Sequence, residues 1–274
     1  MFWSRLVSGV LLLVAAILSM SLGGGVLALV LLLISLTAYR ELTKAVRLTA
    51  AGRKISGLEI VGFVGIIIYY LTIYFEVGDV FLLMCIVGIF LADMFIYVIT
   101  YPKYHVSQVS SAFFSFIYGP VMLSFIYLTR MCPQGIYMVW MILISAWGCD
   151  TCAYAVGMLI GKHKVFPKLS PKKSLEGCIG GIMGAWLIGG LYGHFFVEAV
   201  FPEQTVAWII AFICAAGAVT SIMGDLAASA VKRNYDIKDY GNLIPGHGGI
   251  MDRFDSMIVT APIIYFLTIL MIKL

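Results

Sequence analysis

Long apolar runs separated by short polar loops dominate this sequence and limit what it can fold into. A run of roughly 20 apolar residues is long enough for a helix to cross a bilayer, and a helix bonds its own backbone polar groups there. The first run is too long for one span and too short for two full ones, so we predict two short or tilted helices within it. We therefore expect an all-α polytopic membrane protein with about nine transmembrane helices. The runs cover about 6–38, 58–75, 80–98, 110–128, 136–160, 178–196, 206–231 and 257–272.

The composition supports a membrane protein. Of the 274 residues, 62% are hydrophobic and only 12% are charged, whereas a soluble domain has about 45–50% apolar and about 25% charged residues. The first apolar run shows no small-residue cleavage pattern, so we interpret it as a retained helix. We expect a single integral membrane domain over 1–274, with N-terminal spans at about 1–130 and catalytic spans at about 136–272. The second group would carry two cytoplasmic loops, at 161–177 and 232–256.

The basic residues predict the orientation of the chain. With nine spans, sixteen of the 18 Lys and Arg residues fall on the side of the N-terminus, and only Arg130 and Lys273 fall on the other. Cytoplasmic loops of membrane proteins are enriched in Lys and Arg. The N-terminus is therefore predicted to be cytoplasmic and the C-terminus to lie on the opposite side.

The most polar segment, 224–256, joins the last two apolar runs and is the main candidate site. Asp225 ends one run, and Asp252 and Asp255 stand three residues apart where the next begins. Carboxylates without thiolates suit a hard cation such as Mg²⁺, so we predict these three as metal ligands, with or without a second cation. The alternative is that Asp225 forms a structural ion pair with Lys232 or Arg253. Further polar residues of this segment that we expect at the site are Ser229, Lys232, Arg233, Lys238 and Arg253.

Two loops are candidates for binding phosphate. The Pro-Gly-His-Gly-Gly run at 245–249 leads into a predicted helix start, and glycine lets backbone N–H groups approach an anion; we place His247, Gly248 and Gly249 there. A glycine cluster alone would simply mark a turn. In the loop 161–177 we predict phosphate contacts for Ser170, Lys172, Lys173, Ser174 and Glu176. Lysines beside a span also bind lipid headgroups, which we favour for Lys162, Lys164 and Lys168.

Three further features within the apolar runs have competing interpretations. Asp150 begins a face with Tyr154, Gly157 and Gly161, and could bind metal, contact a nucleotide or accept a helix-packing hydrogen bond. Asp93 has no polar neighbour in its run and is interpreted as a packing or cavity residue. Cys149 and Cys152 form a CxxC without a second pair nearby, so we favour packing over zinc or redox chemistry.

A long pattern from Ser229 to Asp255 resembles the signature of the phosphatidate cytidylyltransferases, also called CDP-diacylglycerol synthases. Here it reads Ser-x-Val-Lys-Arg-x4-Lys-Asp-x-Gly-x2-Ile-Pro-x-His-Gly-Gly-Ile-x-Asp-Arg-Phe-Asp. The Asp150 helix, the loop from Ser170 to Gly177 and the Gly224-Asp225 pair are similar to the family's too, with Ser174 where Thr is common. The resemblance covers roughly the C-terminal half; the earlier spans match only in hydropathy.

The resemblance implies transfer of a cytidylyl group from CTP to phosphatidate, giving CDP-diacylglycerol and pyrophosphate. It also implies Mg²⁺ held by Asp225 and Asp252, a homodimer, and a place in the cell inner membrane with the active site on the cytoplasmic face. Membrane lipid is the expected partner, and nucleic acid is not. Because two anions must meet, charge near both phosphates is what catalysis needs. We therefore list as candidate catalytic residues Asp225, Lys232, Arg233, Asp252 and Arg253.

Three rival functions are weighed against this one. A CDP-alcohol phosphotransferase would need a D-x2-D-G-x2-A-R helix, which the sequence lacks. A cytidylyltransferase of the same fold acting on another lipid phosphate is a nearer rival. A lipid or ion transporter would place charges near the bilayer centre, whereas here they gather at one face.

Overall fold

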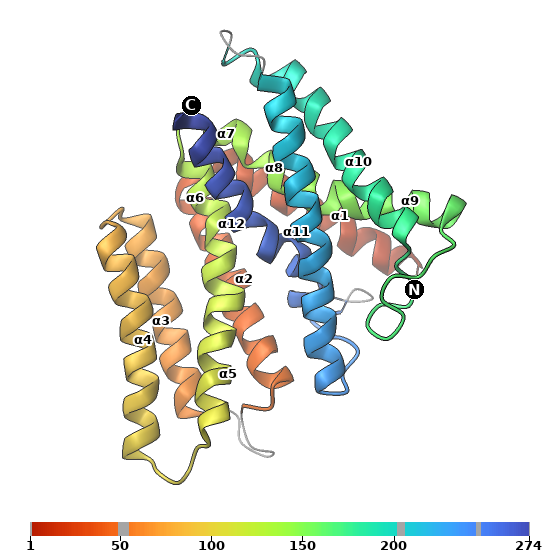
Figure 1. Cartoon of the computed structure of the whole chain (residues 1–274). Coiled ribbons are helices and arrows are strands. Elements are labelled where there is room, and N and C mark those ends of the chain that lie inside the picture. The colour runs from red at the N-terminus through yellow and green to blue at the C-terminus, as the bar shows by residue number, and fades with distance from the viewer. Residues whose placement is uncertain (1, 49–54, 202–205, 245–247, 274) are drawn as a thin grey trace. The chain divides into compact units, whose positions relative to one another are not determined.

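The computed structural model describes residues 2–48, 55–201, 206–244 and 248–273, and these residues fold almost entirely into helices (Figure 1). The η segments are single π-helical turns. The elements in chain order are α1 (Phe2–Leu22), α2 (Gly24–Ala45), α3 (Gly57–Tyr74), α4 (Asp79–Ile99), α5 (Val106–Phe116), η1 (Ile117–Val121), α6 (Met122–Met131), α7 (Gly135–Met138), α8 (Trp140–Leu143), η2 (Ile144–Gly148), α9 (Cys149–Ile160), α10 (Leu175–Tyr192), η3 (Gly193–Val197), α11 (Val206–Asn234) and α12 (Met251–Lys273).

The fold class predicted from the apolar runs is confirmed. Within the described residues, eight helices are long and apolar enough to cross a bilayer, and a shorter apolar stretch, Ser8–Leu22, lies in α1. The first run forms two helices as expected, and the break falls at Gly23, whose φ of 63° is costly for residues with a Cβ. The side of the membrane on which each terminus lies stays a prediction.

Several helices begin earlier than the apolar runs predict. α10 begins at Leu175 and α12 at Met251, where the runs suggest 178 and 257. At α10 the reason is a polar cap, because the Ser174 hydroxyl accepts a hydrogen bond from the Gly177 N–H at 3.2 Å. Hydropathy marks the part of a helix that lies in lipid, whereas capping side chains mark where the helix starts. Asp252 and Asp255 are therefore both inside α12.

The chain divides into two compact units. Unit 1 comprises Met1–Ser124 and Tyr235–Arg253, and unit 2 comprises Phe125–Asn234 and Phe254–Leu274. The earlier prediction of one integral membrane domain over the whole chain stays a prediction.

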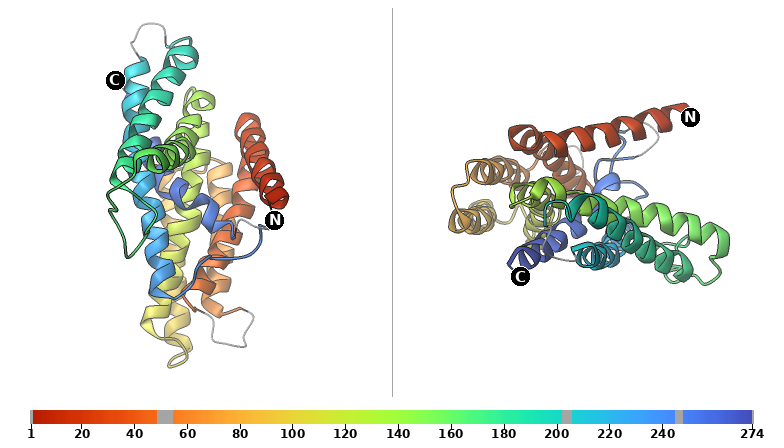
Figure 2. Two further views of the ribbon diagram at one scale, coloured as in Figure 1. Left: turned by 90° about the vertical axis from the view of Figure 1, so that its right-hand side faces the viewer. Right: turned by 90° about the horizontal axis from the view of Figure 1, so that it is seen from above.

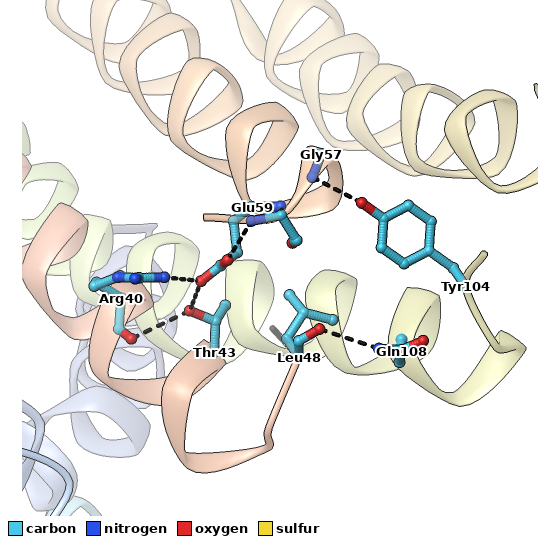
Figure 3. Close-up of polar contacts among 8 residues, drawn as sticks. Arg40, Thr43, Leu48, Gly57, Glu59, Tyr104 and Gln108 are labelled. Atoms are coloured by element: carbon cyan, nitrogen blue, oxygen red, sulfur yellow. Dashed lines mark hydrogen bonds and ion pairs between the residues drawn. The ribbon is translucent and has the colours of Figure 1, made fainter. Parts of the chain in front are cut away.

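Polar contacts in unit 1 tie the ends of its helices together (Figure 3). Glu59, fully buried in the first turn of α3, pairs with Arg40 of α2 and accepts a hydrogen bond from the Thr43 hydroxyl at 2.8 Å. It also completes a capping box with Ser56. Beside it, the Tyr104 hydroxyl accepts the Gly57 N–H at 2.9 Å. Helices α3 and α4 run side by side in this unit (Figure 2).

Unit 2 is built on close helix contacts at small residues. Between α9 and α10, a Cβ added at Gly181 would lie 2.8 Å from the Cys149 sulfur, and one at Gly184 would lie 2.4 Å from the Cys152 sulfur. Cys149 is fully buried and both thiols are free. Packing, which the sequence favoured for the CxxC pair, is thus the role that these contacts give it.

Gly181→Ala is expected to lower the melting temperature of the detergent-solubilised protein by several degrees. The added methyl group would also lie 2.9 Å from the Cys149 carbonyl oxygen, so α9 and α10 would have to separate. Gly190→Ala in the same helix is the control, since its methyl group meets only the Ala211 Cβ at 3.4 Å. Thermal-stability measurements that show equal losses for both variants would contradict the packing argument.

Candidate active site

A cavity of about 450 Å³ in unit 2 is lined by four of the predicted site residues, Asp150, Lys172, Lys173 and Ser174. Ligand pockets commonly have volumes of about 300–1,000 Å³. Helix α9 contributes Asp150, Tyr154 and Gly157 to its wall, so the face predicted from their spacing does line one space. The other side comes from the loop before α10, from the first turn of α10 and from α11. The residues contributed there are Lys164, Pro171, Lys172, Lys173, Ser174, Gly177, Cys178 and Ile222.

The loop from 161 to 174 is folded back on itself by local hydrogen bonds. The Ser170 N–H donates to the Phe166 carbonyl at 2.8 Å, and the Lys173 N–H donates to the Ser170 carbonyl at 3.2 Å. Glu176 fastens the loop from the first turn of α10, because its carboxylate accepts the His163 backbone N–H and pairs with His163 Nδ1 at 2.5 Å. Ser170 and Glu176, predicted to contact phosphate, thus have contacts in the structure that shape the loop.

Lys173 of this loop forms an ion pair with Asp225 on α11. Its ammonium group lies 2.7 Å from Asp225 Oδ2 and also donates to the Ile222 carbonyl at 3.4 Å. Both side chains are partly buried, at 19% and 30% exposed. Asp225 therefore does form an ion pair, but with a loop lysine that the sequence analysis did not consider as its partner.

Asp255 of α12 lies near this pair. Gly224 lets the helices approach closely, because a Cβ there would lie 2.8 Å from the Asp255 carbonyl oxygen. Asp225, Lys232 and Asp150 are all near enough to Asp255 to interact with it electrostatically. Its Oδ1 accepts the Ser256 N–H at 2.8 Å. Unit 2 thus brings three predicted carboxylates and two predicted cations together from four segments far apart in the sequence.

Two predicted residues of α11 lie beyond this cluster. Ser229 stands four residues after Asp225, on the same side of the helix, and is partly exposed. Arg233, in the last turn, is exposed.

Asp252 occupies a different setting, in unit 1. Its Oδ2 accepts hydrogen bonds from the Tyr240 N–H at 2.8 Å and the Gly249 N–H at 3.0 Å. Gly248 has a φ of 87°, which favours glycine, and its carbonyl accepts the Ile244 N–H at 2.9 Å. Ile244 and Gly248 are thus bonded to each other, and residues 245–247 of the predicted turn, His247 included, lie outside the described residues.

The other two cations predicted for this segment differ in their environments. Lys238 is exposed. Arg253 is half-buried, and its Nε has no hydrogen-bond partner among the described residues. A buried guanidinium nitrogen without a partner is costly.

The three-aspartate metal set stays a prediction. Asp225 and Asp255 belong to unit 2 and Asp252 to unit 1. Among the residues that the structure describes, no group of three or more His, Cys, Asp or Glu side chains could hold a metal ion. The donor chemistry still fits Mg²⁺, which proteins commonly bind through one or two carboxylates plus substrate phosphates and water.

The sequence analysis missed Glu41. It is buried, at 7% exposed, and accepts hydrogen bonds from the Ile250 and Met251 N–H groups at the start of α12. The predicted apolar run ended at 38, so Glu41 lay outside any predicted helix, whereas α2 continues to Ala45. The only signal that could have identified Glu41 is that it lies within a helix.

Comparison with known proteins identifies the class of this membrane protein. The sequence matches the family described as "Cytidylyltransferase family" over residues 3–271, so the chain belongs to that family. The match extends through the N-terminal spans, which the resemblance noted above did not cover.

Named relatives give a more particular description. The chain is 38% identical over 143 residues to a phosphatidate cytidylyltransferase of Bacillus subtilis, covering 52% of this chain and 51% of the relative. It is 36% identical over 151 residues to one of Rickettsia bellii (54% and 64%) and 35% identical over 152 residues to one of Haemophilus influenzae (56% and 52%). The matches thus span about half to two thirds of each relative's length.

Proposed function

We propose that this protein transfers a cytidylyl group from CTP to phosphatidate, forming CDP-diacylglycerol and pyrophosphate. The observation that carries the proposal is the cavity of unit 2, which Asp150, Lys172 and Lys173 line together, and beside which Lys173 pairs with Asp225 near Asp255. Family membership and the names of the relatives support the same activity.

The reaction joins two anions, so electrostatic repulsion is its main obstacle. The phosphate oxygen of the lipid attacks the α-phosphorus of CTP, a bond forms between them, and the bond to the pyrophosphate oxygen breaks. Phosphatidate is already ionised, so no general base is required. The protein's contribution is therefore to hold positive charge near the phosphates.

The described residues suit that role. Lys172 and Lys173 line the cavity and would bind the phosphates of CTP. Lys232, Arg233 and Arg253 would add charge near the lipid phosphate. Asp225, Asp252 and Asp255 would hold Mg²⁺, which when bound neutralises charge on the transferring phosphates. Lys173 now neutralises Asp225, and it would be released to a phosphate as the cation site fills.

The setting of the reaction is part of the proposal. The Lys- and Arg-rich loops favour a cytoplasmic face of the cell inner membrane, where CTP is available. A homodimer is proposed from the family resemblance. A related acceptor, such as another lipid phosphate, would use the same charges, because they contact phosphates and not acyl chains.

The direct test is an assay of the purified protein. In detergent micelles with CTP, phosphatidate and Mg²⁺, we expect pyrophosphate and CDP-diacylglycerol to form in equal amounts. Omitting Mg²⁺ should abolish both. No product from the wild-type protein would overturn the proposal, and product only with a different lipid phosphate would favour the alternative acceptor.

A further inference from the structure

Glu41 on α2 holds the start of α12, 209 residues away in the sequence. Its Oε1 accepts the Ile250 N–H at 3.1 Å and its Oε2 accepts the Met251 N–H at 2.8 Å. The first N–H groups of a helix have no partner within the helix, and a negative charge beside them is stabilising. Glu41 thus caps the start of α12 from a distant helix.

Two glycines make room for this carboxylate. A Cβ at Gly241 would lie 2.3 Å from Glu41 Oε1, and a Cβ at Gly249 would lie 2.5 Å from Oε2. Any other residue at either position would displace the carboxylate or the loop. Gly241 and Gly249 therefore leave space that the Glu41 carboxylate fills.

The same segment carries Asp252, which follows directly on the residues that Glu41 holds. Asp252 Oδ2 accepts the Tyr240 and Gly249 N–H groups, while Glu41 accepts those of Ile250 and Met251. Each of these two buried carboxylates thus accepts hydrogen bonds from two backbone N–H groups. Because Gly249, Ile250 and Met251 already donate to carboxylates, these three N–H groups are not open to phosphate.

We propose that Glu41 is a positioning residue for the cytidylyl transfer. By fixing the first turn of α12, it sets where the Asp252 carboxylate points, and so sets the affinity of that carboxylate for Mg²⁺. This inference rests on the proposed function, in which Asp252 is a metal ligand. Groups that orient metal ligands typically change metal affinity by about 10- to 100-fold when they are removed.

The test compares Glu41→Gln with Glu59→Gln. Both remove the charge of a buried glutamate in unit 1 that accepts backbone N–H groups, but Glu59 caps α3 and contacts Arg40 instead of the α12 segment. For each protein we would measure Mn²⁺ binding by electron paramagnetic resonance, the Mg²⁺ dependence of the rate, and hydrogen–deuterium exchange of the peptide 240–252.

For Glu41→Gln we expect about 10-fold weaker Mn²⁺ binding and an equal rise in the half-saturating Mg²⁺ concentration. The maximal rate should largely recover at high Mg²⁺, and exchange should increase within 240–252. Glu59→Gln should melt at a lower temperature but keep wild-type Mn²⁺ affinity. Unchanged exchange in 240–252, or equal Mn²⁺ effects in both variants, would overturn the inference.

The measurements of activity and of metal dependence separate this inference from the proposed function. If the wild-type protein forms no CDP-lipid and binds no Mn²⁺, the proposed function fails, and the role assigned to Glu41 in metal binding fails with it. If the wild-type protein is active and Glu41→Gln requires no more Mg²⁺ than wild type, only the inference fails.

Discussion

Asp225→Asn is expected to lower the rate of CDP-diacylglycerol formation on the order of 100- to 1000-fold while the protein still folds. The substitution keeps the size of the side chain but removes the charge that pairs with Lys173 at 2.7 Å and that we propose binds Mg²⁺. Raising Mg²⁺ should restore little activity, because a neutral amide is a poor ligand for a hard cation. Initial rates measured as pyrophosphate release test this expectation.

Asp236→Asn provides the matched control. It makes the same chemical change at an exposed position two residues after α11. Its backbone is left-handed, with a φ of 55°, a conformation that Asn tolerates as well as Asp. This variant should keep at least half of the wild-type rate. Equal rates for Asp225→Asn and wild type would show that Asp225 is not a metal ligand.

Lys173→Met is expected to raise the KM for CTP and to lower kcat/KM on the order of 100-fold. Methionine preserves much of the apolar stem but removes the ammonium group that faces both the cavity and Asp225. Steady-state kinetics with CTP varied at saturating phosphatidate would measure the effect. Lys168→Met is the control, since Lys168 is an exposed lysine of the same loop that does not line the cavity.

Combining the Lys173 and Asp225 substitutions adds a second test. Because the two side chains are in contact, their effects should not add, and the double variant should be no slower than Asp225→Asn alone. Independent effects that multiply would mean that the 2.7 Å ion pair has no part in catalysis. A Lys173→Met enzyme indistinguishable from Lys168→Met would remove Lys173 from the proposed site.

The sequence predicted the helices well because lipid imposes a simple rule on length and hydropathy. It predicted two helices in the first apolar run and placed most ends within a few residues. It misplaced the starts of α10 and α12 because these depend on polar groups outside the apolar runs: Ser174 at α10, and Glu41 at α12. The division into two units was also not visible, since no linker composition marks it.

The candidate site was predictable as a set of residues but not as a set of contacts. The density of charge around 224–256 and 170–176 identified Asp225, Lys173 and Asp255 without revealing that Lys173 pairs with Asp225. Glu41 was not predicted as a site residue, because a single glutamate in a basic segment is expected to be exposed to solvent. Only the folded chain shows that Gly241 and Gly249 lie against it.

The N-cap of α10 affects where an insertion would displace Lys173. Ser174 fixes the first turn of that helix, and Lys173 immediately precedes it, so the ammonium group is held beside the start of a membrane span. The loop holds Lys173 as well, because the Lys173 N–H donates to the Ser170 carbonyl and the Lys173 carbonyl accepts the Val165 N–H. We expect a single residue inserted between Lys173 and Ser174 to detach the cation from the helix.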